Sequence, residues 1–77
     1  MCGIIGYVGN NNSVPYIIDG LKKLEYRGYD SAGISILQDG KLVTVRAVGK
    51  VSELERASLL VSPKGYTGLG HTRWATH

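Results

Sequence analysis

The second residue of the chain, Cys2, combines a nucleophile with a position that could activate it. Cys2 follows Met1 directly and is the only cysteine among the 77 residues. When Met1 is removed, the thiol of Cys2 and a free α-amine share one carbon atom. A thiol titrates near ~8.5 and an α-amine near ~7.7–8.0, so the amine can accept the thiol proton directly or through one water. The pattern indicates covalent catalysis; the alternative is an apolar edge-strand residue with Met1 retained.

Two histidines near the end of the chain could also carry chemistry. A histidine paired with Cys2 is a rival to the α-amine as general base, and such a dyad would work with Met1 still attached. His71 and His77 match no usual zinc spacing, so no metal site is predicted. The stretch Gly68-Leu69-Gly70 lacks the third glycine and the following helix of a dinucleotide fingerprint.

The residues behind Cys2 predict a strand that holds the nucleophile rigidly. Ile4, Ile5, Tyr7 and Val8 are strand formers, and we expect them to bury the start of the chain in a sheet. Gly3 and Gly6 are expected to leave room for a substrate against the backbone.

The next segments predict a helix and a hairpin. Ser13, with Pro15 in the next turn, indicates a helix start, and apolar residues follow at helical spacing up to the region of Gly28, which supplies a stop. Residues 32–38 and 41–48 predict two strands joined by the type I′ turn Asp39-Gly40. Pairing across this turn predicts an apolar face made by Ile36 opposite Val43 and Ile34 opposite Val45.

The last third of the chain predicts a shorter helix and a further strand. Ser52 and Glu55 form a capping-box pattern that opens a helix through about Leu60, with Leu54, Ala57 and Leu60 or Val61 facing inward. Residues 62–65 predict a loop, and residues 66–71 a strand. The chain then ends in Thr72–His77 without a turn or a cap, which predicts a piece of a longer protein.

Composition excludes several classes of protein. The formal net charge is +3, from basic residues scattered along the chain, which is weak evidence for nucleic-acid binding. No apolar stretch reaches the ~18 residues that cross a bilayer, and no signal peptide is visible. A single cysteine cannot form an internal disulfide, which fits a reducing, cytoplasmic environment.

Three motifs in this order resemble a known family. They are Cys2–Gly6, Leu24–Gly33 and Gly70–His77, with Gly49-Lys50-Val51 as a further match. Together they resemble the leading part of the glutaminase domain of the glutamine–fructose-6-phosphate aminotransferases, within the class II glutamine amidotransferases. Residues 1–77 are then the N-terminal portion of that domain. The resemblance implies an α+β, N-terminal-nucleophile hydrolase fold, a four-layer αββα sandwich to which this chain contributes strands of one sheet, part of its partner sheet and two helices.

The resemblance also implies roles for individual residues. Cys2 is the nucleophile that attacks the side-chain amide of glutamine, releases ammonia and forms a γ-glutamyl thioester. Arg73 binds the α-carboxylate of glutamine, with Thr76 and His77 beside it, because guanidinium and carboxylate form strong bidentate hydrogen bonds. Trp74 helps to close the ammonia route, and Arg27 and Gly28 shape the pocket. Plainer readings are a surface arginine for Arg73 and a core anchor for Trp74.

The implied partners follow from the same resemblance. They are glutamine, and fructose 6-phosphate through an isomerase domain absent from this chain, in a homo-oligomeric parent with no metal and no organic cofactor for the glutaminase step. No nucleic acid and no membrane is expected. Because the family's oxyanion-hole residues lie beyond residue 77, we expect the 77-residue chain alone to be nearly inactive. The rivals are another class II amidotransferase, such as an amidophosphoribosyltransferase, and a non-catalytic module that binds RNA or protein through Tyr26, Arg27, Tyr29, Arg73 and Trp74.

Overall fold

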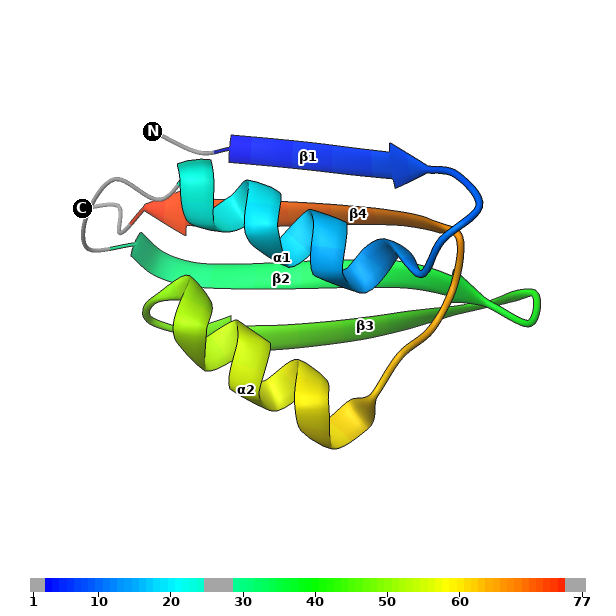
Figure 1. The fold of residues 1–77 in the computed structure, drawn as a ribbon. Coiled ribbons are helices and arrows are strands. Elements are labelled where there is room, and N and C mark those ends of the chain that lie inside the picture. The colour runs from blue at the N-terminus through cyan, green and yellow to red at the C-terminus, as the bar shows by residue number, and fades with distance from the viewer. Residues whose placement is uncertain (1–2, 25–28, 75–77) are drawn as a thin grey trace.

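One antiparallel sheet covered by two helices makes up the described part of the chain (Figure 1). The computed structural model describes residues 3–24 and 29–74. The elements are β1 (Gly3–Val8), α1 (Ser13–Leu24), β2 (Tyr29–Gln38), β3 (Lys41–Val48), α2 (Val51–Val61) and β4 (Thr67–Trp74). The strand order is β1-β4-β2-β3, so β4, the last strand in sequence, lies in the middle of the sheet. The α+β class is confirmed, but all four described strands form one sheet, which corrects the expected division between two sheets.

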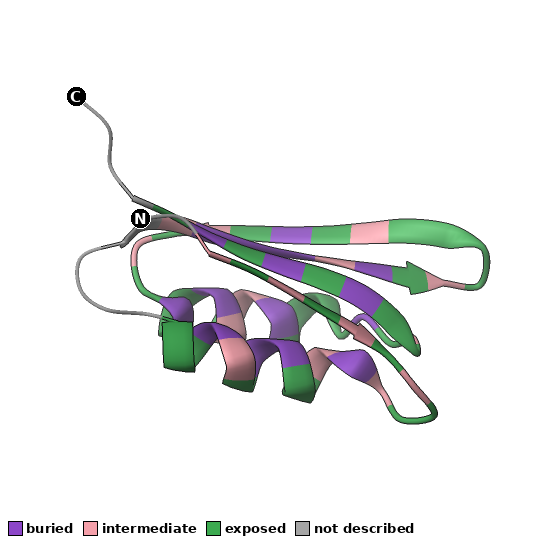
Figure 2. Cartoon of the chain, turned by 90° about the horizontal axis from the view of Figure 1, so that it is seen from above, coloured by how far each residue is buried: buried purple, intermediate pink, exposed green. Residues whose placement is uncertain are grey.

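The core lies between the sheet and the helices, where buried positions alternate with exposed ones along the strands (Figure 2). Ile17 and Leu21 of α1 and Leu54 of α2 are fully buried there, with Ile34 and Ile36 of β2. Helix α1 can approach β4 closely because Gly70 has no side chain: a Cβ at Gly70 would collide with Ile17 and lie 3.0 Å from Leu21 Cδ1. The small residues of β4 therefore allow α1 to pack closely against the sheet.

The hairpin has the predicted register. Gln38 pairs with Lys41, Ile36 with Val43 and Ile34 with Val45. The turn residues Asp39 and Gly40 have φ values of 52° and 78°, and positive φ at both central residues is what a type I′ turn requires. The match arises because turn chemistry and side-chain alternation specify the same register.

Both helices begin as predicted to within a residue, but their caps differ from the prediction. At α1, the Oδ1 atom of Asn12 accepts a hydrogen bond from the Val14 amide at 3.3 Å, while the Ser13 hydroxyl donates to the Gly65 carbonyl at 2.7 Å. Ser13 therefore ties the helix to a distant loop, and Asn12 is the residue that bonds the free amide of the first turn.

The predicted capping box at Ser52 and Glu55 is wrong. The N-cap of α2 is Lys50, without a side-chain cap hydrogen bond, and Glu55 instead pairs with Lys22 of α1 at 2.8 Å. The inward face of α2 carries Val51, Leu54 and Ser58, with Ala57 partly buried.

The C-terminal turn of α2 also differs from the prediction. Leu60 and Val61 are 87% and 53% exposed, so neither faces inward as expected. Ser58 takes the inward place and satisfies its hydroxyl by donating to the Leu54 carbonyl at 2.8 Å. A buried serine that bonds the preceding turn cannot be distinguished by hydropathy from a surface serine.

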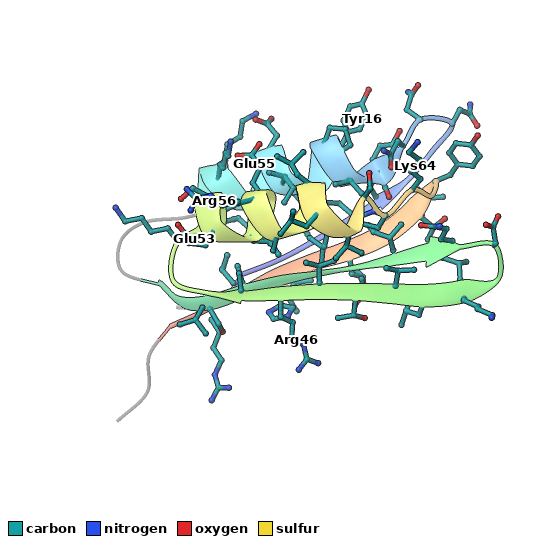
Figure 3. The ribbon with its side chains drawn as sticks, turned by 90° about the horizontal axis from the view of Figure 1, so that it is seen from below. Tyr16, Arg46, Glu53, Glu55, Arg56 and Lys64 are labelled. Carbon is teal, nitrogen blue, oxygen red and sulfur yellow. The ribbon has the colours of Figure 1, made fainter. Side chains whose placement is uncertain are left out.

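The sheet has a second face that the helices do not cover. β1 is an edge strand, and Ile4 and Val8 are 76% and 82% exposed, which corrects the expectation that the whole start of the chain is buried. We call this surface the open face; its exposed apolar residues are Ile4, Val8, Leu37, Leu42, Val48 and Leu69. Figure 3 shows Arg46 projecting from the sheet on this face, away from the helices.

Within the described residues, neither helix combines the length and the apolar character that a bilayer span requires.

Candidate active site

The sheet brings the beginning of β1 beside the end of β4 (Figure 1). Gly3, the residue after Cys2, pairs with Thr72, the residue before Arg73. On the other side of β4, Arg73 pairs with Ser31 and Trp74 pairs with Tyr29. Segments at opposite ends of the sequence thus meet at one corner of the sheet, where β1, β4 and β2 lie next to one another.

Arg73 lies on the open face of this corner. Along β4, Gly70 and Thr72 are buried toward the helices, whereas His71 and Arg73 are exposed, as alternation along a strand dictates. A guanidinium in this place can bind a carboxylate from solvent, and it stands on a central strand with neighbours on both sides. The arrangement suits a rigidly held anion-binding group.

Thr72 is a residue of this corner that the sequence patterns did not single out. It is only 1% exposed, and its Oγ1 atom has no hydrogen-bond partner among the described residues. The Oγ1 atom lies 3.2 Å from the place that a Cβ on Gly3 would occupy, and Leu24 Cδ1 lies 3.0 Å from the same point. Only the structure reveals this buried hydroxyl without a partner. The sequence gives no sign of it, because threonine is common in strands.

The two glycines of β1 make room for the protein's own side chains. The space at Gly3 is filled by Leu24 and Thr72, and the space at Gly6 by Leu69, whose Cδ2 atom lies 3.3 Å from a Cβ placed there. The expectation that these glycines leave room for a substrate is therefore wrong for the described structure. They allow close packing of β1 against its neighbours instead.

The imidazole of His71 turns toward β2. A Cβ at Gly33 would lie 2.7 Å from His71 Nε2, so the ring covers that glycine. Since β1 and β2 flank β4 on opposite sides, the ring points away from the strand that follows Cys2. A dyad between Cys2 and a histidine stays a prediction, because Cys2 lies outside the described residues. Among the described residues, no three histidine, cysteine or acidic side chains gather as a metal site would require.

Most of the other predicted site residues lie outside the described residues. These are Cys2, Arg27, Gly28, Thr76 and His77. Of the predicted set, the structure describes Arg73 and the backbone of Trp74, and it brings both to the corner beside Gly3.

The basic side chains that the structure pairs do not form a continuous stripe. Lys22 pairs with Glu55 at 2.8 Å, Lys23 with Asp19 at 3.4 Å and Arg56 with Glu53 at 3.6 Å. All three pairs join residues of α1 and α2, whereas Arg46 and Arg73 belong to β3 and β4. Figure 3 shows Glu53, Glu55 and Arg56 on the helices and Arg46 on the sheet. Of the residues on which the RNA-binding alternative rests, only Arg73 has a described side chain, so that alternative stays a prediction.

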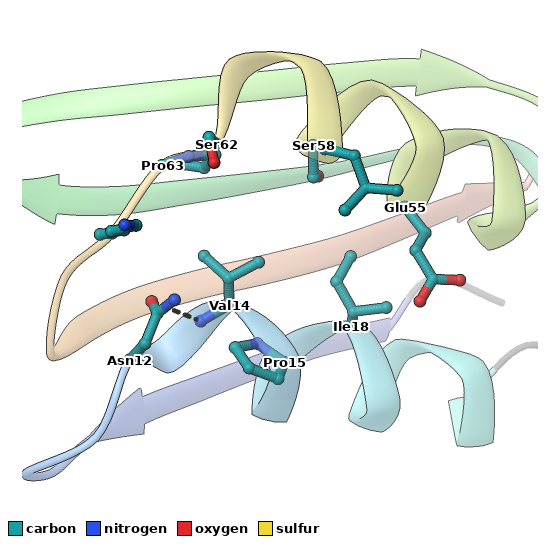
Figure 4. Close-up of a pocket in the computed structure, with 10 residues that line it drawn as sticks. Asn12, Val14, Pro15, Ile18, Glu55, Ser58, Ser62 and Pro63 are labelled. Atoms are coloured by element: carbon teal, nitrogen blue, oxygen red, sulfur yellow. Dashed lines mark hydrogen bonds between the residues drawn. The ribbon is translucent and has the colours of Figure 1, made fainter.

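Two hollows in the described part of the chain lie away from Arg73. One, of about 240 Å³, lies between α1 and α2 and is lined by residues such as Val14, Ile18 and Pro63 (Figure 4). The other, of about 570 Å³, lies beside the hairpin turn at Asp39 and the loop at Tyr66. This turn is at the end of the sheet opposite Arg73, and Arg73 lines neither hollow.

Comparison with known proteins gives strong matches in sequence. Glutamine–fructose-6-phosphate aminotransferases (isomerising) from Aquifex aeolicus and from Streptococcus agalactiae serotype III are 52% and 57% identical to the chain over 77 residues. The enzyme from Gloeobacter violaceus is 53% identical over 78 residues. Each match covers the whole of this chain and 13% of the relative. No protein-family model matches.

A solved structure confirms the fold. The glutamine phosphoribosylpyrophosphate amidotransferase from B. subtilis, complexed with ADP and GMP, superposes on all of this chain with a TM-score of 0.84 and 28% identity. The match covers 17% of that protein. The resemblance seen in the sequence is thereby confirmed: the whole chain matches the N-terminal part of glutamine–fructose-6-phosphate aminotransferases and has the fold of the corresponding part of an N-terminal-nucleophile hydrolase.

Proposed function

We propose that residues 1–77 are the N-terminal portion of the glutaminase domain of an enzyme that makes glucosamine 6-phosphate and glutamate from fructose 6-phosphate and glutamine. The observation that carries the proposal is identity of 52–57% along the whole chain with relatives that bear this activity in their name. The chain spans only 13% of their length, so the sugar-converting step belongs to other parts of the full-length protein.

The glutaminase step begins at Cys2 in this proposal. After removal of Met1, the α-amine takes the thiol proton, and the thiolate attacks the side-chain amide carbon of glutamine. The α-ammonium group gives this proton to the departing nitrogen, so that ammonia leaves and a γ-glutamyl thioester remains. Water then hydrolyses the thioester to glutamate. The pairing of Gly3 with Thr72 supports this assignment, because it puts the residue after the nucleophile beside the residue before Arg73.

Arg73 binds the α-carboxylate of glutamine in the same proposal. Its exposure at the corner of the sheet and the turning of His71 toward β2 leave it accessible there. Thr76 and His77 follow it in sequence and contribute to the same site, while Trp74, Arg27 and Gly28 shape the pocket and the ammonia route.

The proposal is tested with a glutamine-mimicking electrophile on the full-length protein. We expect one label, mapped by mass spectrometry to Cys2 in molecules that have lost Met1, and no label in a Cys2→Ala variant. Label on another residue, or full glutaminase activity in molecules that retain Met1, would contradict the proposed mechanism.

The structural neighbour favours a second candidate with a different acceptor. The neighbour is a phosphoribosylpyrophosphate amidotransferase, and in this candidate the same glutaminase unit delivers ammonia to phosphoribosylpyrophosphate. Identity of 28% against 52–57% ranks this candidate second. Supplying the full-length protein with glutamine and either fructose 6-phosphate or phosphoribosylpyrophosphate, and measuring the aminated product, distinguishes the two.

A further inference from the structure

The hollow beside the hairpin turn has the size of a small-molecule site and lies far from Arg73. Its volume is about 570 Å³, within the range of ~300–1,000 Å³ that is typical of ligand sites. Three segments line it: residues 10–12 before α1, 37–39 at the hairpin and 64–66 before β4. Leu37 pairs with Thr67, which is about 20 Å from Arg73 along β4. The proposed glutaminase step uses none of the lining residues.

Hydrogen bonds hold the three segments together. The amide and the hydroxyl of Ser13 both donate to the Gly65 carbonyl at 2.7 Å, and the Lys64 amide donates to Gln38 Oε1 at 2.7 Å. Gly65 fits closely against β2, because a Cβ there would collide with the Leu37 carbonyl oxygen. The hollow is therefore formed before a ligand arrives, which lowers the ordering cost of binding.

Two side-chain amides of the lining have their oxygen atoms engaged. Asn12 Oδ1 accepts from the Val14 and Gly65 amides, at 3.3 and 3.4 Å, and Gln38 Oε1 accepts from the Lys64 amide. The NH2 group of each side chain is left to donate to a ligand. Such donors bind the oxygen atoms of hydroxyl and phosphate groups, so they favour a ligand rich in oxygen.

Two side chains of opposite charge also line the hollow. Asp39 at the hairpin turn and Lys64 in the loop after α2 (Figure 3) are exposed, and neither takes part in an ion pair within the described residues. A lysine ammonium binds phosphate as a point charge, whereas arginine matches a carboxylate better. Asp39 attracts an ammonium group and repels a polyanion. The lining therefore fits a ligand that carries one phosphate and one amine.

We propose that this hollow binds a hydroxyl-rich compound with one phosphate and one ammonium group, that is, an amino sugar phosphate. Lys64 binds the phosphate, Asp39 binds the ammonium group, and the NH2 groups of Asn12 and Gln38 donate to hydroxyl oxygens. The identity of the ligand rests on the proposed function, because glucosamine 6-phosphate, the product of the proposed reaction, has all of these groups. The site lies apart from Arg73, so its ligand does not compete with glutamine.

Hydrogen–deuterium exchange of the full-length protein tests the proposal, with glucosamine 6-phosphate as the probe. The amides of Ser13 and Lys64 are hydrogen-bonded at the hollow, so their exchange is slow enough to follow. We expect the probe to slow exchange in residues 10–13, 37–39 and 64–66 in a saturable manner. Fructose 6-phosphate, which lacks the amine, should need about a tenfold higher concentration, and inorganic phosphate a still higher one.

Variants of the two charged residues assign their roles. Lys64→Gln should raise the half-saturating concentration of glucosamine 6-phosphate at these segments about tenfold to a hundredfold, because a charged hydrogen bond is lost, while Lys64→Arg should stay within about threefold. Asp39→Asn suits the positive φ of the turn, 52°, and should make glucosamine 6-phosphate and fructose 6-phosphate equally effective. Lys41→Gln is the matched control, because Lys41 is an exposed lysine of the same hairpin that does not line the hollow. It should change neither value.

Protection that persists unchanged in Lys64→Gln would come from a ligand bound elsewhere in the protein, and it overturns the proposal. Absence of protection at the three segments, or equal half-saturation by inorganic phosphate, overturns it as well. Failure of the proposed function gives a different result: the unaltered protein then forms no glucosamine 6-phosphate from fructose 6-phosphate and glutamine. When that reaction proceeds and the segments stay unprotected, only the further site is refuted.

Discussion

The imidazole of His71 covers Gly33 across the junction between β4 and β2, with Nε2 only 2.7 Å from the place of a glycine Cβ. Gly33 is therefore a requirement for the position of His71. The ring therefore lies on the β2 side of β4, and β1 is on the other side.

Replacing Gly33 by alanine should force the His71 ring to move. We expect Gly33→Ala to destabilise the protein by no more than about 1 kcal/mol, because the His71 side chain is exposed and the end of its ring can turn away. The denaturant midpoint of unfolding measures the change. In a His71→Ala background the same substitution should cost much less, because the colliding ring is gone, and equal costs in both backgrounds would refute the contact.

Replacing Asn12 tests which residue caps α1. Asn12→Ala should cost about 1 kcal/mol, because the Val14 amide loses its acceptor, whereas Asn12→Asp keeps the oxygen and should be nearly neutral. The neighbouring exposed Asn11 provides the control, and Asn11→Ala should leave the unfolding midpoint unchanged. If Asn12→Ala leaves the unfolding midpoint unchanged, Ser13 and not Asn12 is the residue that caps α1.

Breaking the pair between Lys22 and Glu55 should have a small effect. Both side chains are 45% exposed, and exposed ion pairs contribute about 0–1 kcal/mol. We expect Glu55→Gln to lower the unfolding free energy by no more than about 1 kcal/mol at low salt, and by less at 0.5 M salt because of screening. A larger loss that persists in salt would mean that Glu55 acts through packing.

Replacing Arg73 should weaken glutamine binding selectively. Arg73→Lys keeps the charge but loses the planar fork, so the KM for glutamine should rise roughly tenfold to a hundredfold, in line with ~1.5–3 kcal/mol for a charged hydrogen bond. Arg46→Lys, on the same face of the sheet, is the control and should leave KM unchanged. An Arg73→Lys variant with the original KM would assign the carboxylate to another residue.

The hairpin was predictable from sequence because local rules agree there, whereas β2 begins at Tyr29 and β4 runs to Trp74, each three residues beyond the predicted strand. Asp39-Gly40 demands one turn type, and alternation on either side gives the same register as the turn. The caps were not predictable in this way. Asn12 and Ser13 are both good capping residues, and the choice between them depends on Gly65, more than fifty positions away and bonded to Ser13.

The corner of the candidate site was predictable only through resemblance. Nothing local to Gly3 or Thr72 states that they pair, because the strand order that joins them is a long-range property of the sheet. The buried hydroxyl of Thr72 is invisible in sequence for the same reason. The expected burial of Ile4 and Val8 failed because β1 has a side turned to the open face, and hydropathy does not report which side of a strand is covered.

The placement of β4 between β1 and β2 has a consequence for biosynthesis. Within the described chain, β1 is made first, yet its only ladder partner is the strand made last. During translation β1 cannot pair with β4 until some seventy residues have left the ribosome. An enzyme that removes Met1 can therefore act during that interval, before β1 and β4 pair.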